Sequence, residues 1–74
     1  MMPRLPPAQR QRMRSAIQAL PEPTRRIYLA HLLHSDDYLT IGVRERLGVR
    51  EVERHIADAI VLIDRYLSSN GHSQ

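Results

Sequence analysis

Residues 37–63 constrain the fold of this chain most, because they have the spacing of two helices joined by a tight turn. A short helix is predicted over residues 38–45, a turn over residues 46–48, and a longer helix from Val49 onward. Asp37 is a suitable N-cap, since its side-chain oxygen can accept a hydrogen bond from a free amide of the first turn. This spacing is typical of a helix-turn-helix, which presents its second helix to the major groove of DNA.

Two further helices are predicted before this segment, over residues 8–20 and 23–34. Apolar side chains recur at steps of four and three in the first of them, at Met13, Ile17 and Leu20. Pro21 ends that helix, because proline lacks an N–H donor and disfavours helix in the preceding residue. Pro23 fits the first turn of the next one. The helix over 23–34 is apolar nearly all round, which indicates burial by its neighbours, although a partner could cover part of it.

The last helix is predicted over residues 49–67 and has one apolar face. The side chains on that face are Val52, Ile56, Ala59, Ile60, Ile63, Tyr66 and Leu67. We expect one shared core of Ile27, Ile41, Leu47, Val52, Ile56 and Ile63. Gly42 is costly inside a helix, so we expect a close crossing of two helices there.

These elements predict an all-α fold, a small four-helix domain that contains a helix-turn-helix. The chain has 74 residues, enough for one domain over residues 8–68. A proline- and arginine-containing arm (residues 1–7) and a tail (residues 69–74) are expected to be flexible. The chain has no cysteine for a disulfide or thiolate site, and no apolar run long enough for a membrane span. We therefore expect a cytoplasmic protein without a cofactor.

The charge is distributed unevenly along the chain. Residues 1–26 carry six arginines against one acid, a balance of +5. Residues 27–74 carry five arginines against seven acids, a balance of −2. The basic segment is suited to contact with phosphate or another polyanion, but a solvated tail that keeps the protein in solution explains the same composition.

The sequence from residue 20 onward resembles the C-terminal, promoter-binding domain (region four) of bacterial sigma factors. Residues 20–29, Leu-Pro-Glu-Pro-Thr-Arg-Arg-Ile-Tyr-Leu, are similar to the opening of that domain in the extracytoplasmic-function type, including its iron-citrate regulator branch. Residues 38–42, Tyr-Leu-Thr-Ile-Gly, occupy the positions where that family has an aromatic residue, two polar residues, Ile and Ala. Residues 48–56, Gly-Val-Arg-Glu-Val-Glu-Arg-His-Ile, resemble its recognition helix, which begins with serine. The resemblance covers roughly residues 16–67.

The resemblance implies two surfaces. Carried over by position, the surface for double-stranded, promoter-like DNA consists of Arg50, Glu51, Glu53, Arg54 and His55, with Arg44 and Arg46 near phosphate. Arginine suits guanine and phosphate, and glutamate can accept from cytosine. The family also docks on the flap of the RNA polymerase beta subunit, and anti-sigma factors are a second class of partner. Candidate partner residues are Tyr28, Leu29, Leu32, Val61 and Leu62.

Three departures from the family keep a second hypothesis open. Residues 36–64 carry seven acids against four arginines, a balance of −3, although phosphate attraction dominates DNA affinity. Arg46 replaces the usual glycine of the turn, and these 74 residues do not include the domain that melts promoters, so we expect no complete sigma factor unless the chain is an excised fragment. The first hypothesis is a DNA-binding transcription regulator. The second is a sigma-like interaction module that binds polymerase or an anti-sigma factor.

Catalysis is the function class with the least support in the sequence. No nucleophile with a base, glycine-rich phosphate loop or paired carboxylates can be recognised, so we expect no enzyme activity. His31 and His34 lie three residues apart on one predicted helix, but no further ligand accompanies them at a convincing spacing. We therefore expect no metal site.

Overall fold

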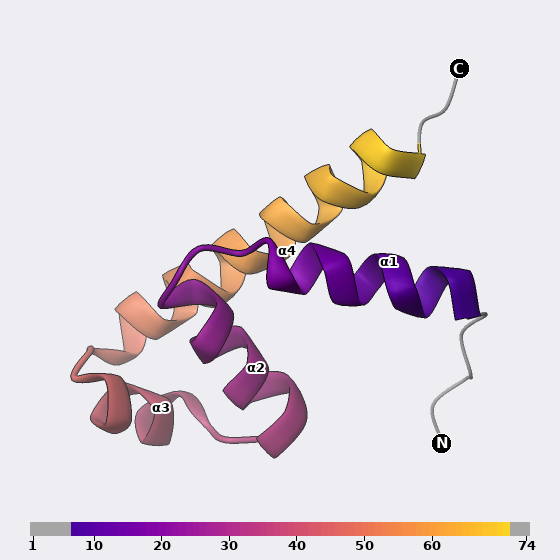
Figure 1. Cartoon of the computed structure of the whole chain (residues 1–74). Helices are drawn as coiled ribbons and strands as arrows, with labels where there is room; N and C mark the ends of the chain where they lie inside the picture. Colours follow the sequence, from indigo (N-terminus) through magenta and orange to yellow (C-terminus); the bar gives the residue numbers. More distant parts are fainter. Residues whose placement is uncertain (1–6, 72–74) are drawn as a thin grey trace.

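The computed structural model describes residues 7–71, which form four helices and no strand (Figure 1). The helices are α1 (Pro7–Gln18), α2 (Thr24–His34), α3 (Tyr38–Glu45) and α4 (Val49–Gly71). The predicted all-α domain of four helices is thus confirmed for this part of the chain. None of these helices combines the length and apolar character that a membrane span requires.

The ends of α1 and α4 differ from the predicted boundaries. α1 stops at Gln18, and the next residues form a turn in which the Leu20 amide donates to the Ile17 carbonyl at 3.1 Å. Helix is disfavoured in the residue before Pro21, which explains the early end. α4 continues to Gly71, so residues 69–71 of the predicted tail are helical, as is Pro7 of the predicted arm. The rest of the arm and tail lies outside the described residues.

The turn between α3 and α4 is held by backbone hydrogen bonds. Arg46 adopts a left-handed conformation with φ 60° and ends α3. The Leu47 amide donates to the Gly42 carbonyl at 2.8 Å, and the half-buried Leu47 side chain packs against the core. At the other end of α3, the Asp37 side chain accepts from the Thr40 amide at 2.7 Å, as the sequence predicts. These bonds fix where α4 begins.

Two apolar clusters form the core, and both lie on α4. The turn cluster joins α2, α3 and the first half of α4, through Ile27, Ala30, Ile41, Val52 and Ile56. The α1 cluster joins α1 and the second half of α4, through Ala16, Leu20, Ala59 and Ile63. Ile27, Ile41 and Val52 are completely buried. Burial of each such side chain contributes about 1.5–3 kcal/mol.

Three expectations about burial were wrong. Ile63 belongs to the α1 cluster, so the predicted shared core is split in two. Ile60 is 56% exposed, because it lies at the edge of the α4 face that the other helices cover. Leu32 and Leu33 are 48% and 66% exposed, because α2 packs on α4 and α3 but has no comparable contact with α1. α2 is therefore not buried all round.

Gly42 is required by the turn more than by a helix crossing. A Cβ added there would lie 2.6 Å from the Leu47 carbonyl oxygen, whereas the nearest atom of α4, on Val52, would be 3.7 Å away. A Cβ added at Gly48 would meet only a Glu51 carboxylate oxygen at 3.6 Å, an ordinary contact. The two glycines should therefore respond differently to substitution.

We predict that Gly42→Ala lowers the free energy of unfolding by about 1–2 kcal/mol. Overpacking costs about 1–3 kcal/mol, and the upper part of that range applies because the added Cβ would meet a backbone oxygen. Alanine's better helix propensity offsets about 1 kcal/mol of that cost. Gly48→Ser is the matched control and should match or slightly exceed the parent, because serine is a better N-cap than glycine. Urea unfolding followed by circular dichroism measures both. A Gly42→Ala protein as stable as the parent would contradict this description of the turn.

Candidate nucleic-acid interface

The outer face of α4 presents Arg50 and Arg54, one helical turn apart. Both residues are exposed, and neither makes an ion pair within residues 7–71. Asp58 is exposed one turn beyond Arg54, and Val61 is 48% exposed on the same face. These two guanidinium groups are available to a ligand, because no carboxylate of the described part of the chain binds them.

Glu51 has a local structural role that sequence reasoning missed. Its carboxylate accepts a hydrogen bond from the Gly48 amide at 2.9 Å. This is one half of a capping box, in which the third residue of a helix reaches back to the N-cap amide. A negative charge in the first turn also favours the helix dipole. The signal in the sequence was the spacing of three residues between Gly48 and Glu51.

His55 lies on the inner flank of α4, away from the two arginines. Its Nδ1 is 2.8 Å from the Thr24 hydroxyl oxygen, and the imidazole is half-buried. Thr24 is 5% exposed at the first residue of α2. The pair joins the start of α2 to α4. It was missed because helical spacing places His55 beside the core face but does not identify a partner 31 residues away.

The two arginines near the turn differ in how freely they can reach a ligand. The Arg44 guanidinium lies 3.0 Å from the Asp36 carboxylate, so its charge is partly neutralised. Arg46 is exposed at the left-handed position of the turn and makes no ion pair within the described residues. Glu53 is also exposed, on the other side of Arg50 from Glu51. The predicted DNA residues are therefore divided between three sides of the α3–turn–α4 unit.

Arg26 and Glu45 form a clasp between α2 and the end of α3. The Arg26 guanidinium donates two hydrogen bonds to the Glu45 carboxylate, each of 2.7 Å. The Glu45 side chain is 10% exposed. These hydrogen bonds lower the pKa of Glu45 below its ordinary value of 4.5, against the opposing effect of burial. Bidentate geometry of this kind fixes orientation as well as distance.

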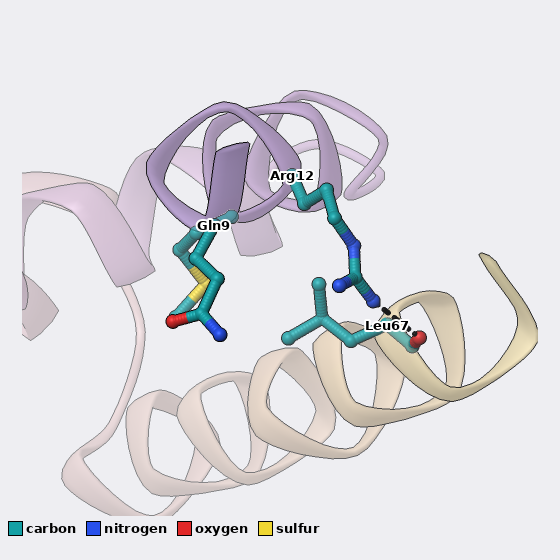
Figure 2. A pocket seen from close by; sticks show the side chains of 4 residues that line it. Gln9, Arg12 and Leu67 are labelled. Carbon is teal, nitrogen blue, oxygen red and sulfur yellow. Dashed lines mark hydrogen bonds between the residues drawn. The ribbon is translucent and has the colours of Figure 1, made fainter. Parts of the chain in front are cut away.

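Several arginines of the basic segment are bound within the fold. Figure 2 shows Arg12 reaching from α1 to the end of α4, where it donates to the Leu67 carbonyl oxygen at 2.9 Å. Arg25 pairs with Glu22. Arg10 and Arg14 are exposed on α1 without an ion pair among the described residues. Part of the basic segment is thus a helix that belongs to the folded domain.

The predicted partner residues do not form one surface. Tyr28 and Leu62 pack against the α1 cluster and are half-buried. Leu29 and Leu32 line a groove between α1 and α2, whereas Val61 lies on the outer face of α4. Only Leu29 and Leu32 are therefore neighbours on an accessible surface.

The two histidines on α2 have different surroundings. The His31 ring packs against Tyr38 with ring centroids 5.6 Å apart, and its Nδ1 is buried without a hydrogen bond. His34 is exposed at the end of α2. Within residues 7–71, no group of three histidine or carboxylate side chains is placed to hold a metal ion.

Comparison of the chain with known protein families, with curated proteins and with solved structures finds no match. The functional interpretation therefore depends on the geometry of the chain itself and on the resemblance of residues 16–67 described above.

We predict that the Arg26–Glu45 clasp makes stability depend on pH. The pKa of Glu45 is lower in the folded chain than in the unfolded chain, so the stabilisation is complete above about pH 4.5 and is lost as the pH falls through the lowered pKa. Glu45→Gln should be less stable at neutral pH and should lose less stability on acidification. Urea unfolding at several pH values tests this.

Glu53→Gln is the matched control, because Glu53 is exposed and makes no ion pair within the described residues. It should keep the pH dependence of the parent. Equal pH dependence in Glu45→Gln and the parent would show that the clasp does not stabilise the fold.

Proposed function

We propose that this protein is a DNA-binding transcription regulator whose α3–turn–α4 unit is a helix-turn-helix. In this proposal the first half of α4 enters the major groove. The observation that carries it is the pair of exposed, unpaired guanidinium groups of Arg50 and Arg54, at the end of α4 that adjoins the turn. In helix-turn-helix proteins the N-terminal residues of the second helix contact the base edges.

The rigidity of the unit supports this role. The turn is held by the hydrogen bond from Leu47 to Gly42, and the inner face of α4 is anchored by the buried Val52 and Ile56. A recognition helix must keep its orientation while its outer face meets the bases. The guanidinium of arginine can then donate two parallel hydrogen bonds to guanine or to phosphate.

The acidic residues near the turn should weaken DNA binding less than their number suggests. Glu45 is neutralised by Arg26, Asp36 faces Arg44, and the Glu51 carboxylate caps α4. The Arg50–Arg54 face then has two further exposed acids beside it, Glu53 and Asp58. The guanidinium groups of Arg46, Arg50 and Arg54 are not held by these carboxylates, so they are available to a phosphate backbone.

The acidic side chains that remain exposed on α4 favour a second candidate. Glu53, Asp58 and Asp64 would repel phosphate if α4 lay deep in the groove. The alternative is a sigma-like module that binds RNA polymerase or an anti-sigma factor. In that case, a pull-down with such a partner would be lost on Leu29→Asp and kept on Arg54→Ala.

We predict that Arg50→Ala and Arg54→Ala each weaken specific DNA binding by about 1–3 kcal/mol without loss of fold. The test is a fluorescence titration against a duplex selected by the protein from a randomised pool. Arg65→Ala is the matched control, since Arg65 is exposed on the same helix but about 16 Å farther from the turn than Arg54. It should bind almost as the parent does.

Two results would contradict the proposed function. One is that the protein enriches no sequence from the pool. The other is that Arg54→Ala and Arg65→Ala weaken binding equally, because a recognition helix has a defined reading end and nonspecific attraction does not.

A further inference from the structure

A groove of about 490 Å³ lies between α1 and α2. α1 and α2 each pack on α4 but have no comparable contact with each other, which leaves the space between them open. Apolar side chains line much of the groove, namely Met13, Ile17, Leu29, Leu32 and Leu33. Leu32 and Leu33 are the most exposed of these, at 48% and 66%. Unless a partner covers this groove, its apolar side chains remain in contact with water, which is unfavourable.

Arginines surround the groove on both sides. Arg10 and Arg14 line it from α1, one turn apart, and Arg25, which is paired with Glu22, lines it from α2. No acidic side chain among the described residues lines it. The groove extends over about two turns of each helix, or roughly 12 Å. Its chemistry fits a short helical stripe that combines apolar and acidic side chains.

The same chain carries such a stripe on α4. Glu53, Ala57, Ile60 and Asp64 follow one another at steps of four, three and four residues, so they share one side of the helix. All four are exposed, and Ile60 is 56% exposed. The two carboxylates are about 16 Å apart along the helix axis, with the apolar side chains between them. The stripe is complementary to the groove in charge and about one helical turn longer than it.

We propose that two copies of this chain form a reciprocal dimer, in which the α4 stripe of each copy occupies the α1–α2 groove of the other. In such a two-fold arrangement each contact occurs twice, so Ile60 and the exposed leucines are buried in both copies. Arg50 and Arg54 are not members of either surface, but they border the stripe, because Glu53 and Ala57 each lie three residues after one of them. The inference goes beyond the proposed DNA binding and can fail independently of it.

The test exchanges charge between the two surfaces. One variant combines Arg10→Glu with Arg14→Glu, and the other combines Glu53→Arg with Asp64→Arg. Each variant alone places like charges at both contacts and should sediment as a monomer where the parent is a dimer, with self-association weakened about tenfold or more. An equimolar mixture restores opposite charges at both contacts, so it should sediment as a heterodimer. Analytical ultracentrifugation measures all four samples.

Circular dichroism establishes that each variant is folded, which is expected because all four substituted residues are exposed. Asp58→Arg is the matched control for reversal of one charge on α4, because Asp58 is exposed outside the stripe, and it should remain dimeric. A parent that is monomeric at every concentration measured would overturn the proposal, and so would a dimer that is indifferent to either charge reversal. A mixture that stays monomeric would also overturn it, because reciprocity requires both restored contacts.

Discussion

The packing of three helices on one face of α4 is the constraint on which the rest of this structure depends. α2 and α3 cover the first half of that face through Val52 and Ile56, and α1 covers the second half through Ala59 and Ile63. Because α1, α2 and α3 all pack on this one face, none of them covers the outer side of α4. The exposure of Arg50 and Arg54 is thus a consequence of how the core is built.

The turn before α4 fixes the orientation of α4 relative to α3. Gly42 leaves room for the Leu47 carbonyl, and the left-handed Arg46 reverses the chain direction. Polar contacts from α2 then hold both sides of the turn, through the clasp of Arg26 with Glu45 and the hydrogen bond between the Thr24 hydroxyl and the His55 ring. The first half of α4 is fixed at its base while its outer face stays open, which is what the proposed recognition of DNA requires.

The sequence predicted those features whose causes are local. The Asp37 cap, the role of Leu47 in the turn and the helix ends near Pro21 and Val49 follow from the chemistry of neighbouring residues. The features it missed depend on where distant helices lie. Leu32 and Ile60 are as apolar as the residues of the core. They are exposed because the other described helices do not pack over them, which local sequence cannot reveal.

The same distinction explains the outcome for the candidate site. Glu51 and His55 have the residue types of base-contacting side chains, as Arg50 and Arg54 do, but in the structure they bind partners within the fold. The contact of Glu51 could have been predicted, because Glu51 lies three residues after Gly48, the cap of the last helix. The Thr24 partner of His55 depends on the tertiary fold.

The central claim is that the outer face of the first half of α4 meets DNA. Backbone amide NMR shifts, recorded while a selected duplex is titrated into the labelled protein, test it most directly. The account predicts the largest shift changes around Arg46, Arg50 and Arg54, and little change at Leu32 and Leu33 on α2. Shift changes concentrated on α2 with α4 unaffected would contradict it.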